Sequence, residues 1–255
     1  MTKNCVMGWD AAWTPNGSGA WCVLSKEPKG CKIHRWETSP TGTETMKKSL
    51  FDLVEAYDPE LIAIDMPVAD VPVTSYREAD RATTRAFSRF GCPVHSPIPQ
   101  RPGDWGWMCV SVLKEKGYHC KINTQDGDKT FAEVYPHTAL LKLIRSSRRI
   151  PYKVGRSGKY WPDKSTLERK QGIVQQLNRI QDRLFEELKL TEPKLLIHAR
   201  LKGTELKVLE DRLDALICAW ASYEILEGRF LPYGDAEAAI WNPDVKELDL
   251  LTGDL

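Results

Sequence analysis

The stretch LIAIDMP, residues 61–67, has four apolar residues followed by an aspartate, a methionine and a proline. A short apolar run of this kind is typical of a strand that is buried on both faces of a sheet. Asp65 stands where that strand ends. Because aspartate often begins a turn and Pro67 cannot continue a strand ladder, Asp65 considered alone has a simple structural explanation. The segments around it decide whether that explanation is sufficient.

The residues before this stretch predict the rest of a sheet. Strands are expected over 4–10 (NCVMGWD), 20–25 (AWCVLS) and 31–37 (CKIHRWE), because turn-forming segments separate them. A helix is expected over 44–57, where apolar residues recur at helical spacing. Three antiparallel strands, a helical crossover and a parallel fourth strand predict a mixed α/β sheet with helices on its faces.

The remainder of the chain adds a fifth expected strand, 130–136 (TFAEVYP). Further helices are expected over about 75–90, 105–116, from 137 onward, 166–188 and 205–226. No internal repeat or linker composition divides the sequence. We therefore expect one domain, 1–255, with a helix and loop insertion over about 66–130 and a basic aromatic loop over about 145–164.

The composition is that of a globular protein. The chain has 255 residues, of which 42% are hydrophobic, and a net charge of +1. No apolar run approaches the roughly 18 residues that a membrane span requires, and the first residues lack the apolar core of a signal peptide. The cysteines are scattered and contain no C-x-x-C pair. These features predict a cytoplasmic protein that does not associate with membranes.

Three of the expected strands carry an acidic residue where a buried strand should be apolar. These residues are Asp10, Asp65 and Glu133. An ionised carboxylate is costly to bury unless it is paired or bound to a metal. One such residue is usually a turn or a cap, but three in this strand order favour a site at the edge of the sheet.

The expected helix 205–226 adds two more acidic residues. Asp214 lies at the edge of its apolar stripe, and Asp211 lies about 60° further round the helix axis. A spacing of three residues puts both carboxylates on neighbouring turns of one face. The alternative is a solvated helix flank on which Arg212 and Glu210 are surface partners.

Four or five carboxylates without a histidine or thiol cluster suit a hard cation such as Mg²⁺ or Mn²⁺. Two such ions, about 3.5–4 Å apart, can activate water on one side of a phosphodiester and stabilise the leaving oxygen on the other. Under this hypothesis Asp65 closes its strand because the strand holds a metal ligand rigidly at the rim of the sheet.

The order of these acids also carries a resemblance. An aspartate ends the first strand, another closes the fourth, and D-x-x-D-A-L lies on the last long helix. The segments that match are GWD (8–10), IAIDMPV (62–68), YREADRATTRAF (76–87), FAEVYPHTAL (131–140) and EDRLDALICA (210–219). In this order the chain resembles the ribonuclease-H-like superfamily, which includes Holliday-junction resolvases. More closely, it resembles the predicted ribonuclease-H-like nucleases of domain of unknown function (DUF) family 429.

The resemblance implies a metal-dependent nuclease with a ribonuclease-H-like sheet, here of five strands. It implies Asp10, Asp65, Glu133 and Asp214 as ligands of Mg²⁺ or Mn²⁺, with Asp211 as a further catalytic acid. One departure is that His137 stands where an acid is expected after Glu-x-x-Pro.

Basic and aromatic residues predict a nucleic-acid partner, either DNA or RNA, with single-stranded and branched forms among the candidates. From 142 to 183 the chain has twelve Lys or Arg residues and only three acidic residues. On the expected helix 75–90, arginines recur every fourth residue, a spacing that can grip phosphates: Arg77, Arg81 and Arg85. The basic loop mixes cations with rings that could stack on bases: Tyr152, Lys153, Arg156, Lys159, Trp161 and Lys164. The alternatives are a solvated helix face and a loop whose rings pack onto the core.

Two other functions remain open from the sequence. One is a non-catalytic nucleic-acid-binding module on the same fold, since a fold alone does not determine function. The other is an actin- or hexokinase-like phosphotransferase. The segment after Asp10 argues against the phosphotransferase, because its glycines come late, at 17 and 19.

Overall fold

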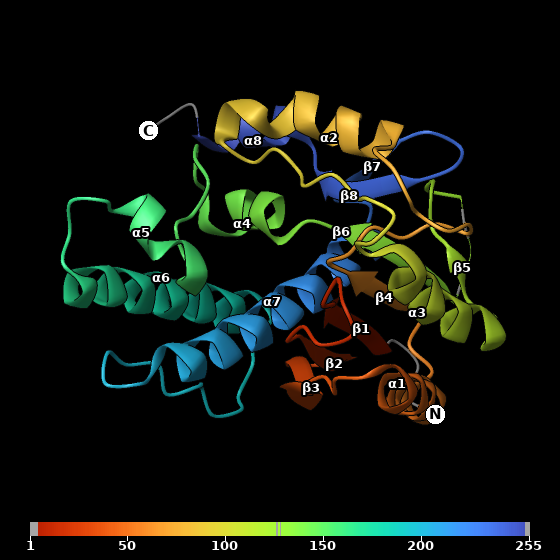
Figure 1. Ribbon diagram of the computed structural model, residues 1–255, viewed down its shortest axis with the longest axis horizontal. Coiled ribbons are helices and arrows are strands. Elements are labelled where there is room, and N and C mark those ends of the chain that lie inside the picture. Colours follow the sequence, from red (N-terminus) through yellow and green to blue (C-terminus); the bar gives the residue numbers. More distant parts are fainter. Residues whose placement is uncertain (1–4, 126, 128, 253–255) are drawn as a thin grey trace.

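The computed structural model describes residues 5–125, 127 and 129–252. Residue 4 of the first expected strand, and both ends of the expected domain, lie outside these ranges. The described residues form one eight-stranded sheet with helices on its faces (Figure 1). Its strands are β1 (Cys5–Asp10), β2 (Ala20–Glu27), β3 (Gly30–Thr38), β4 (Leu61–Ile64), β5 (His119–Cys120), β6 (Thr130–Val134), β7 (Phe230–Gly234) and β8 (Ala239–Pro243).

The strand order is β3-β2-β1-β4-β6-β8-β7, and β5 also pairs with β6. β1, β4, β6 and β8 run parallel, whereas β2, β3 and β7 pair antiparallel with their neighbours. The predicted mixed α/β fold is therefore confirmed, and the five expected strands are β1 to β4 and β6. The expected count of five is too low. β5 has only two residues, and β7 contains a proline and a glycine, which weaken the sequence signal for a strand.

Eight α-helices occur in the described part of the chain. They are α1 (Thr43–Tyr57), α2 (Glu78–Phe87), α3 (Gly103–Glu115), α4 (Pro136–Ile144), α5 (Ser157–Tyr160), α6 (Thr166–Glu187), α7 (Gly203–Leu226) and α8 (Val245–Thr252). A short 3-10 turn, η1 (Ser88–Phe90), extends α2, and another, η2 (Val154–Arg156), precedes α5. None of these helices is both long enough and apolar enough to cross a membrane.

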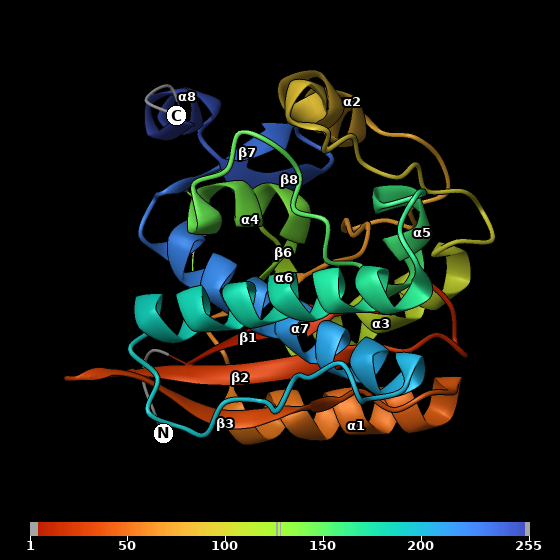
Figure 2. The same ribbon diagram turned by 90° about the vertical axis from the view of Figure 1, so that its left-hand side faces the viewer.

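The alternation of side chains along the strands divides the core into two layers. On β1, Val6 packs with α4, α6 and α7 on one face of the sheet. Its neighbours Met7 and Trp9 turn to the other face, where α1 and α3 cover them. Figure 2 shows this arrangement, with α1 on one side of β2 and β3 and with α6 and α7 on the other. The central strands are buried on both faces, which explains their nearly continuous apolar sequence.

Helix α7 approaches the sheet very closely at Gly8 of β1. A Cβ atom there would lie 2.0 Å from the backbone nitrogen of Ala219 and 2.1 Å from the carbonyl oxygen of Ala215. Only glycine therefore lets α7 rest directly on the strand. This contact places the N-terminal half of α7 beside the end of β1.

Candidate metal centre

The three acidic residues of the strands lie at the carboxyl ends of neighbouring parallel strands. Asp10 is the last residue of β1, and Asp65 directly follows β4. Because β1, β4 and β6 are parallel, with Trp9 opposite Ile64 and Ile64 opposite Glu133, their carboxyl ends meet. The sheet thus brings Asp10, Asp65 and Glu133 to a common rim.

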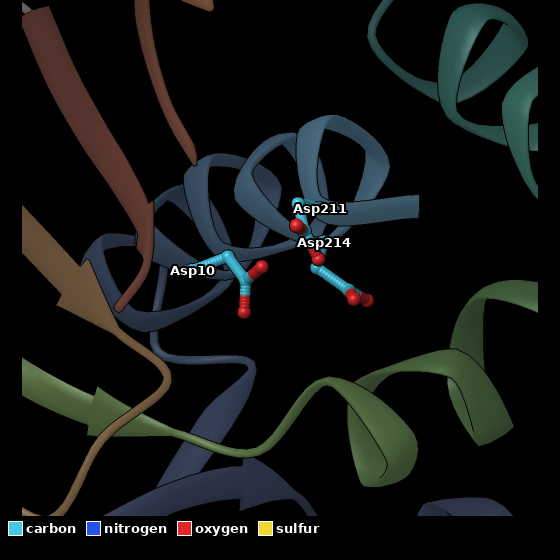
Figure 3. A group of neighbouring side chains, drawn as sticks. All are labelled: Asp10, Asp211 and Asp214. Carbon is cyan, nitrogen blue, oxygen red and sulfur yellow. The ribbon is translucent and has the colours of Figure 1, made fainter. Parts of the chain in front are cut away.

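Helix α7 contributes Asp211 and Asp214 to the same place. One carboxylate oxygen from each of Asp10, Asp211 and Asp214 can be chosen so that all three lie within 4.8 Å of one another (Figure 3). Asp211 and Asp214 are completely buried, while Asp10 is half-buried. The alternative of a solvated helix flank is therefore wrong, and Glu210 is buried as well.

These three carboxylates fit a hard cation. Oxygen ligands lie about 2.0–2.1 Å from Mg²⁺ and about 2.3–2.6 Å from Ca²⁺, so two ligands of one ion are separated by at most about 4 Å for Mg²⁺ and about 5 Å for Ca²⁺. In addition, Oδ2 of Asp211 is buried without a hydrogen-bond partner among the described residues. A buried carboxylate oxygen that lacks a donor is costly, and a cation would satisfy it. We call Asp10, Asp65, Asp211 and Asp214 the acid cluster.

The electrostatics of the acid cluster are those of crowded carboxylates. Burial, followed by the negative charge of Asp214, raises the pKa of Asp10 well above its usual value. Burial is also the main reason that the pKa of Asp65 rises to about 7, with Asp214 and Glu133 adding to the effect. Neither Asp10 nor Asp65 forms an ion pair with a residue in the described ranges.

Two lysines partly neutralise the cluster. Lys153 pairs with Asp214 and lies 3.6 Å from Glu210, and Lys207 pairs with Asp211. Burial alone would lower the pKa of Lys153, but Asp214 and other acids raise it well above its usual value. Lys153 was predicted to contact nucleic acid. Here its ammonium group faces the acid cluster instead, because Asp214 and Glu210 provide the charges that compensate its burial.

Glu133 has a different partner. Arg77 donates to both of its carboxylate oxygens, at 2.8 and 2.9 Å, and the backbone N–H of Val68 donates at 3.0 Å. Arg77 also pairs with buried Asp80. Glu133 is thus held by an arginine outside the acid cluster. Arg77 was predicted to grip phosphates, but its guanidinium faces Glu133 and Asp80 and its side chain is only 13% exposed.

The other predicted nucleic-acid residues fall into two groups. Arg81 and Arg85 are exposed and form ion pairs with Glu78, and Lys159 and Lys164 are exposed near α5. Arg156 is half-buried and donates to His95.

The two aromatic side chains do not present free rings. Tyr152 is fully buried and donates to Asp214 at 2.6 Å, so the expectation that it stacks on bases is wrong. Trp161 packs closely against Gly172 of α6, where any Cβ atom would lie 2.8 Å from the ring. The alternative of rings that pack onto the core therefore holds for both.

Two cavities open beside the acid cluster. The larger, of about 410 Å³, contains Asp65, Lys153 and Glu210 in its lining, and the smaller, of about 340 Å³, contains Asp10. The two share four lining residues: Trp13, Asp65, Arg101 and Lys207. A ligand can therefore reach the carboxylates from either side of Asp65.

Several of these residues were not singled out in the sequence. Lys207 lies four residues before Asp211, and this i, i+4 spacing of opposite charges could have identified the pair. Arg101 and Arg149 also line the larger cavity. Arg149 belongs to the basic segment 142–183 but was not singled out within it, and Arg101 has no local pattern that would have marked it. Only the fold brings them to the site.

Comparisons with known proteins give a family and two solved structures. The structure of Thermus thermophilus RuvC has a TM-score of 0.45 and 10% identity over 92% of this chain and 99% of that one. The structure of T. thermophilus RuvC in complex with Holliday junction substrate has a TM-score of 0.41 and 12% identity, again over 92% of this chain and 99% of that one. A likeness this loose assigns no role to any residue of this chain.

The comparison with curated proteins gave no match. The family described as "Protein of unknown function (DUF429)" matches residues 8–238, a range that includes all four members of the acid cluster. The chain belongs to this family.

Proposed function

We propose that the protein is a divalent-metal-dependent phosphodiesterase that acts on nucleic acid. The observation that supports this proposal is the convergence of Asp10, Asp211 and Asp214 within 4.8 Å beside Asp65. Carboxylates gathered at the end of a sheet without nitrogen or sulfur ligands are the donor set that Mg²⁺ and Mn²⁺ prefer.

Asp10, Asp211 and Asp214 would hold the ion, with Asp65 as the fourth carboxylate of the cluster. When bound, Mg²⁺ or Mn²⁺ supplies charge stabilisation at the phosphate and a more acidic water. Glu133 is not included among the ligands in this proposal, since Arg77 already occupies both of its oxygens.

The protein's own residues orient these carboxylates. The hydroxyl of Tyr152 donates to one oxygen of Asp214, and Lys153 donates to the other. Lys207 bonds to Asp211 and to Glu210, so both aspartates of α7 are held by side chains. Groups that fix the orientation of metal ligands usually affect activity almost as strongly as the ligands themselves.

Cations around the cavities favour a phosphate-containing substrate. Arg101 and Lys207 line both cavities, and Arg156 lines the larger one. Arginine and lysine at such a site bind phosphate groups through charged hydrogen bonds. Trp13, over whose ring Arg101 lies at 5.1 Å, offers an aromatic surface at the junction of the cavities.

The test is cleavage of a panel of single-stranded, duplex and branched DNA and RNA in Mn²⁺, Mg²⁺ or EDTA. We expect cleavage with Mn²⁺ or Mg²⁺ and none in EDTA. Asp10→Asn and Asp214→Asn should reduce the rate by at least about 100-fold, whereas Asp52→Asn, on the exposed face of α1, should not. Binding that depends on salt without any cleavage would instead identify a non-catalytic binding module.

A further inference from the structure

The larger cavity contains a group of arginines that the proposed metal centre does not use. Arg101, Arg149 and Arg156 line it, and none of them forms an ion pair with a carboxylate in the described part of the chain. We call these three residues the arginine group. Arg149 and Arg156 are half-buried and Arg101 is exposed. Half-buried charges are normally paired, so Arg149 and Arg156 in particular lack a counter-ion.

Arg149 shows this most clearly. It donates to Nε2 of His137 and, at 3.4 Å, to the hydroxyl of Tyr135, both of which are uncharged partners. Its Nε atom is buried and has no acceptor among the residues that the structure describes. A guanidinium with a buried, unused N–H and no acidic partner carries a cost that an anionic ligand would remove.

His137 provides a second unused donor next to the first. Its ring is buried, and because Nε2 accepts from Arg149, the neutral ring carries its proton on Nδ1. Nδ1 is buried and finds no acceptor within the described part of the chain. His137 also lies in the first turn of α4, whose N-terminus favours negative charge.

The charges of the arginine group all affect one side chain, His95. Burial lowers the pKa of His95, and the charges of Arg156, Arg149 and Arg101 lower it further. His95 also lines the same cavity, and Arg156 donates to its Nε2 at 2.8 Å. At about 410 Å³ the cavity is within the range of small-ligand sites.

We propose that this cavity binds the phosphomonoester at the end of a nucleic-acid strand, so that the enzyme acts from phosphorylated ends. An internal phosphodiester carries a single negative charge, whereas a terminal phosphate carries about −1.5 to −2 at pH 7. Three arginines that form no ion pair within the described residues, together with the Nδ1–H of His137, match the more highly charged group. Asp65 and Lys207 line the cavity too, so a phosphate held there lies beside the acid cluster. The choice of nucleic acid as substrate class rests on the proposed function.

Binding without catalysis tests this inference. One six-nucleotide strand, made as DNA and as RNA, is compared with a 5′-phosphate, a 3′-phosphate or hydroxyl ends, using fluorescence anisotropy in EDTA. We expect a phosphate at one of the two ends to tighten binding by about 10- to 100-fold. Arg149→Met and Arg156→Met should each lose most of this gain. Arg148→Met, which changes the exposed neighbour of Arg149, should keep it.

Equal affinity of the wild-type protein for phosphorylated and hydroxyl-ended strands would overturn the proposal. So would a gain that survives in both arginine variants. Arg156→Met serves as the second variant in case Arg149→Met does not fold. Arg156 donates to the exposed side chain of His95, so its replacement disturbs the core less. A nucleoside monophosphate that binds as tightly as the six-nucleotide strand would overturn the assignment to a strand end.

A cleavage assay separates this inference from the proposed function. If circular single-stranded DNA is cut as fast as the linear form in Mn²⁺, the nuclease stands and the preference for ends fails. If no substrate is cut but terminal phosphates still bind through Arg149 and Arg156, the cavity assignment stands and the proposed function fails.

Discussion

Asp65 directly follows β4 and lies beside other carboxylates. Its backbone N–H donates to the carbonyl of Trp9 at 2.9 Å, which continues the parallel pairing of β1 and β4 by one residue. The side chain lines both cavities, and burial raises its pKa to about 7. A residue that served only to begin a turn would have neither the neighbouring acids nor the raised pKa.

We predict that Asp65→Asn abolishes metal-dependent cleavage and leaves the metal-free protein equally or more stable. Asparagine makes the same local backbone bonds as aspartate, but it removes a charge that repels Asp10 and Asp214. The measurement is thermal unfolding in EDTA together with cleavage in Mn²⁺, with Asp52→Asn as the control. A variant that still cleaves would contradict the mechanism, whatever its stability.

His137 gives a prediction about pH. Burial, Arg149 and other cations lower its pKa well below the usual 6.5, so the folded protein keeps the ring neutral while the unfolded chain takes up a proton. Because the unfolded state then binds more protons, this residue makes the folded protein less stable as pH falls below 6.5.

We expect His137→Gln, which keeps an acceptor for Arg149, to reduce the loss of folding stability at low pH. The stability difference between variant and wild type should change by up to about 1.4 kcal/mol per pH unit between pH 6.5 and 5. Chemical denaturation in EDTA at several pH values measures it. Parallel pH profiles for the two proteins would show that His137 is already protonated in the folded state.

At the scale of single residues, the sequence identified the acids but not their partners. Asp10, Asp65 and Asp214 could be predicted because a carboxylate stands out in an apolar strand or beside an apolar stripe. Glu133 has the same local signal, yet it pairs with Arg77, 56 positions earlier in the chain. Such a partner can be recognised only when the fold brings the two segments together.

Among the elements, α7 has the strongest influence on the site. Its contact with Gly8 fixes how far its first turns lie from Asp10, and α6 and β2 support it from either side. The long helices α6 and α7 were predicted to within two residues at each end, since their apolar stripes are long and regular. The pairing of α7 with β1 was not predicted, because a glycine in a strand has several possible explanations.

We predict that Gly8→Ala destabilises the protein by about 3 kcal/mol or more and reduces metal binding. The new Cβ atom would overlap the backbone of α7, which cannot move without disturbing the core. Gly203→Ala, at the first residue of the same helix, is the control, since no atom of the described residues lies within 4 Å of its added Cβ. Thermal unfolding and Mn²⁺ titration compare the two. Equal stability would mean that α7 does not rest on β1 as described.

The basic segment 145–164 shows what charge counting misses. Its excess of positive charge is real, but Lys153 turns inward to the acid cluster and Arg149 turns to His137. The remaining cations are divided between the rim of the larger cavity and the exposed surface near α5. The local excess of Lys and Arg therefore predicted an anionic partner. The position of each cation, in contrast, depends on which buried groups need a compensating charge.

For the molecule as a whole, the acid cluster is the place where folding and ligand binding are coupled. Without metal, the fold keeps Asp211 and Asp214 buried by bringing Lys207 and Lys153 to them. Asp10 and Asp65 have no such partner among the described residues. A cation that binds only the folded protein would relieve their repulsion and stabilise the entire structure.

We therefore predict that Mn²⁺ raises the melting temperature in a concentration-dependent way. A ligand at 100 times its Kd adds about 2.7 kcal/mol, which for a chain of this size corresponds to a rise of roughly 5–10 °C. Asp214→Asn should abolish the rise and Asp52→Asn should retain it. Lys207→Met should lower the melting temperature in EDTA but show a larger rise with Mn²⁺, because the competing ammonium group near Asp211 is gone. An unchanged melting temperature of the wild type in millimolar Mn²⁺ would mean that the lysines alone balance the cluster and that no metal binds there.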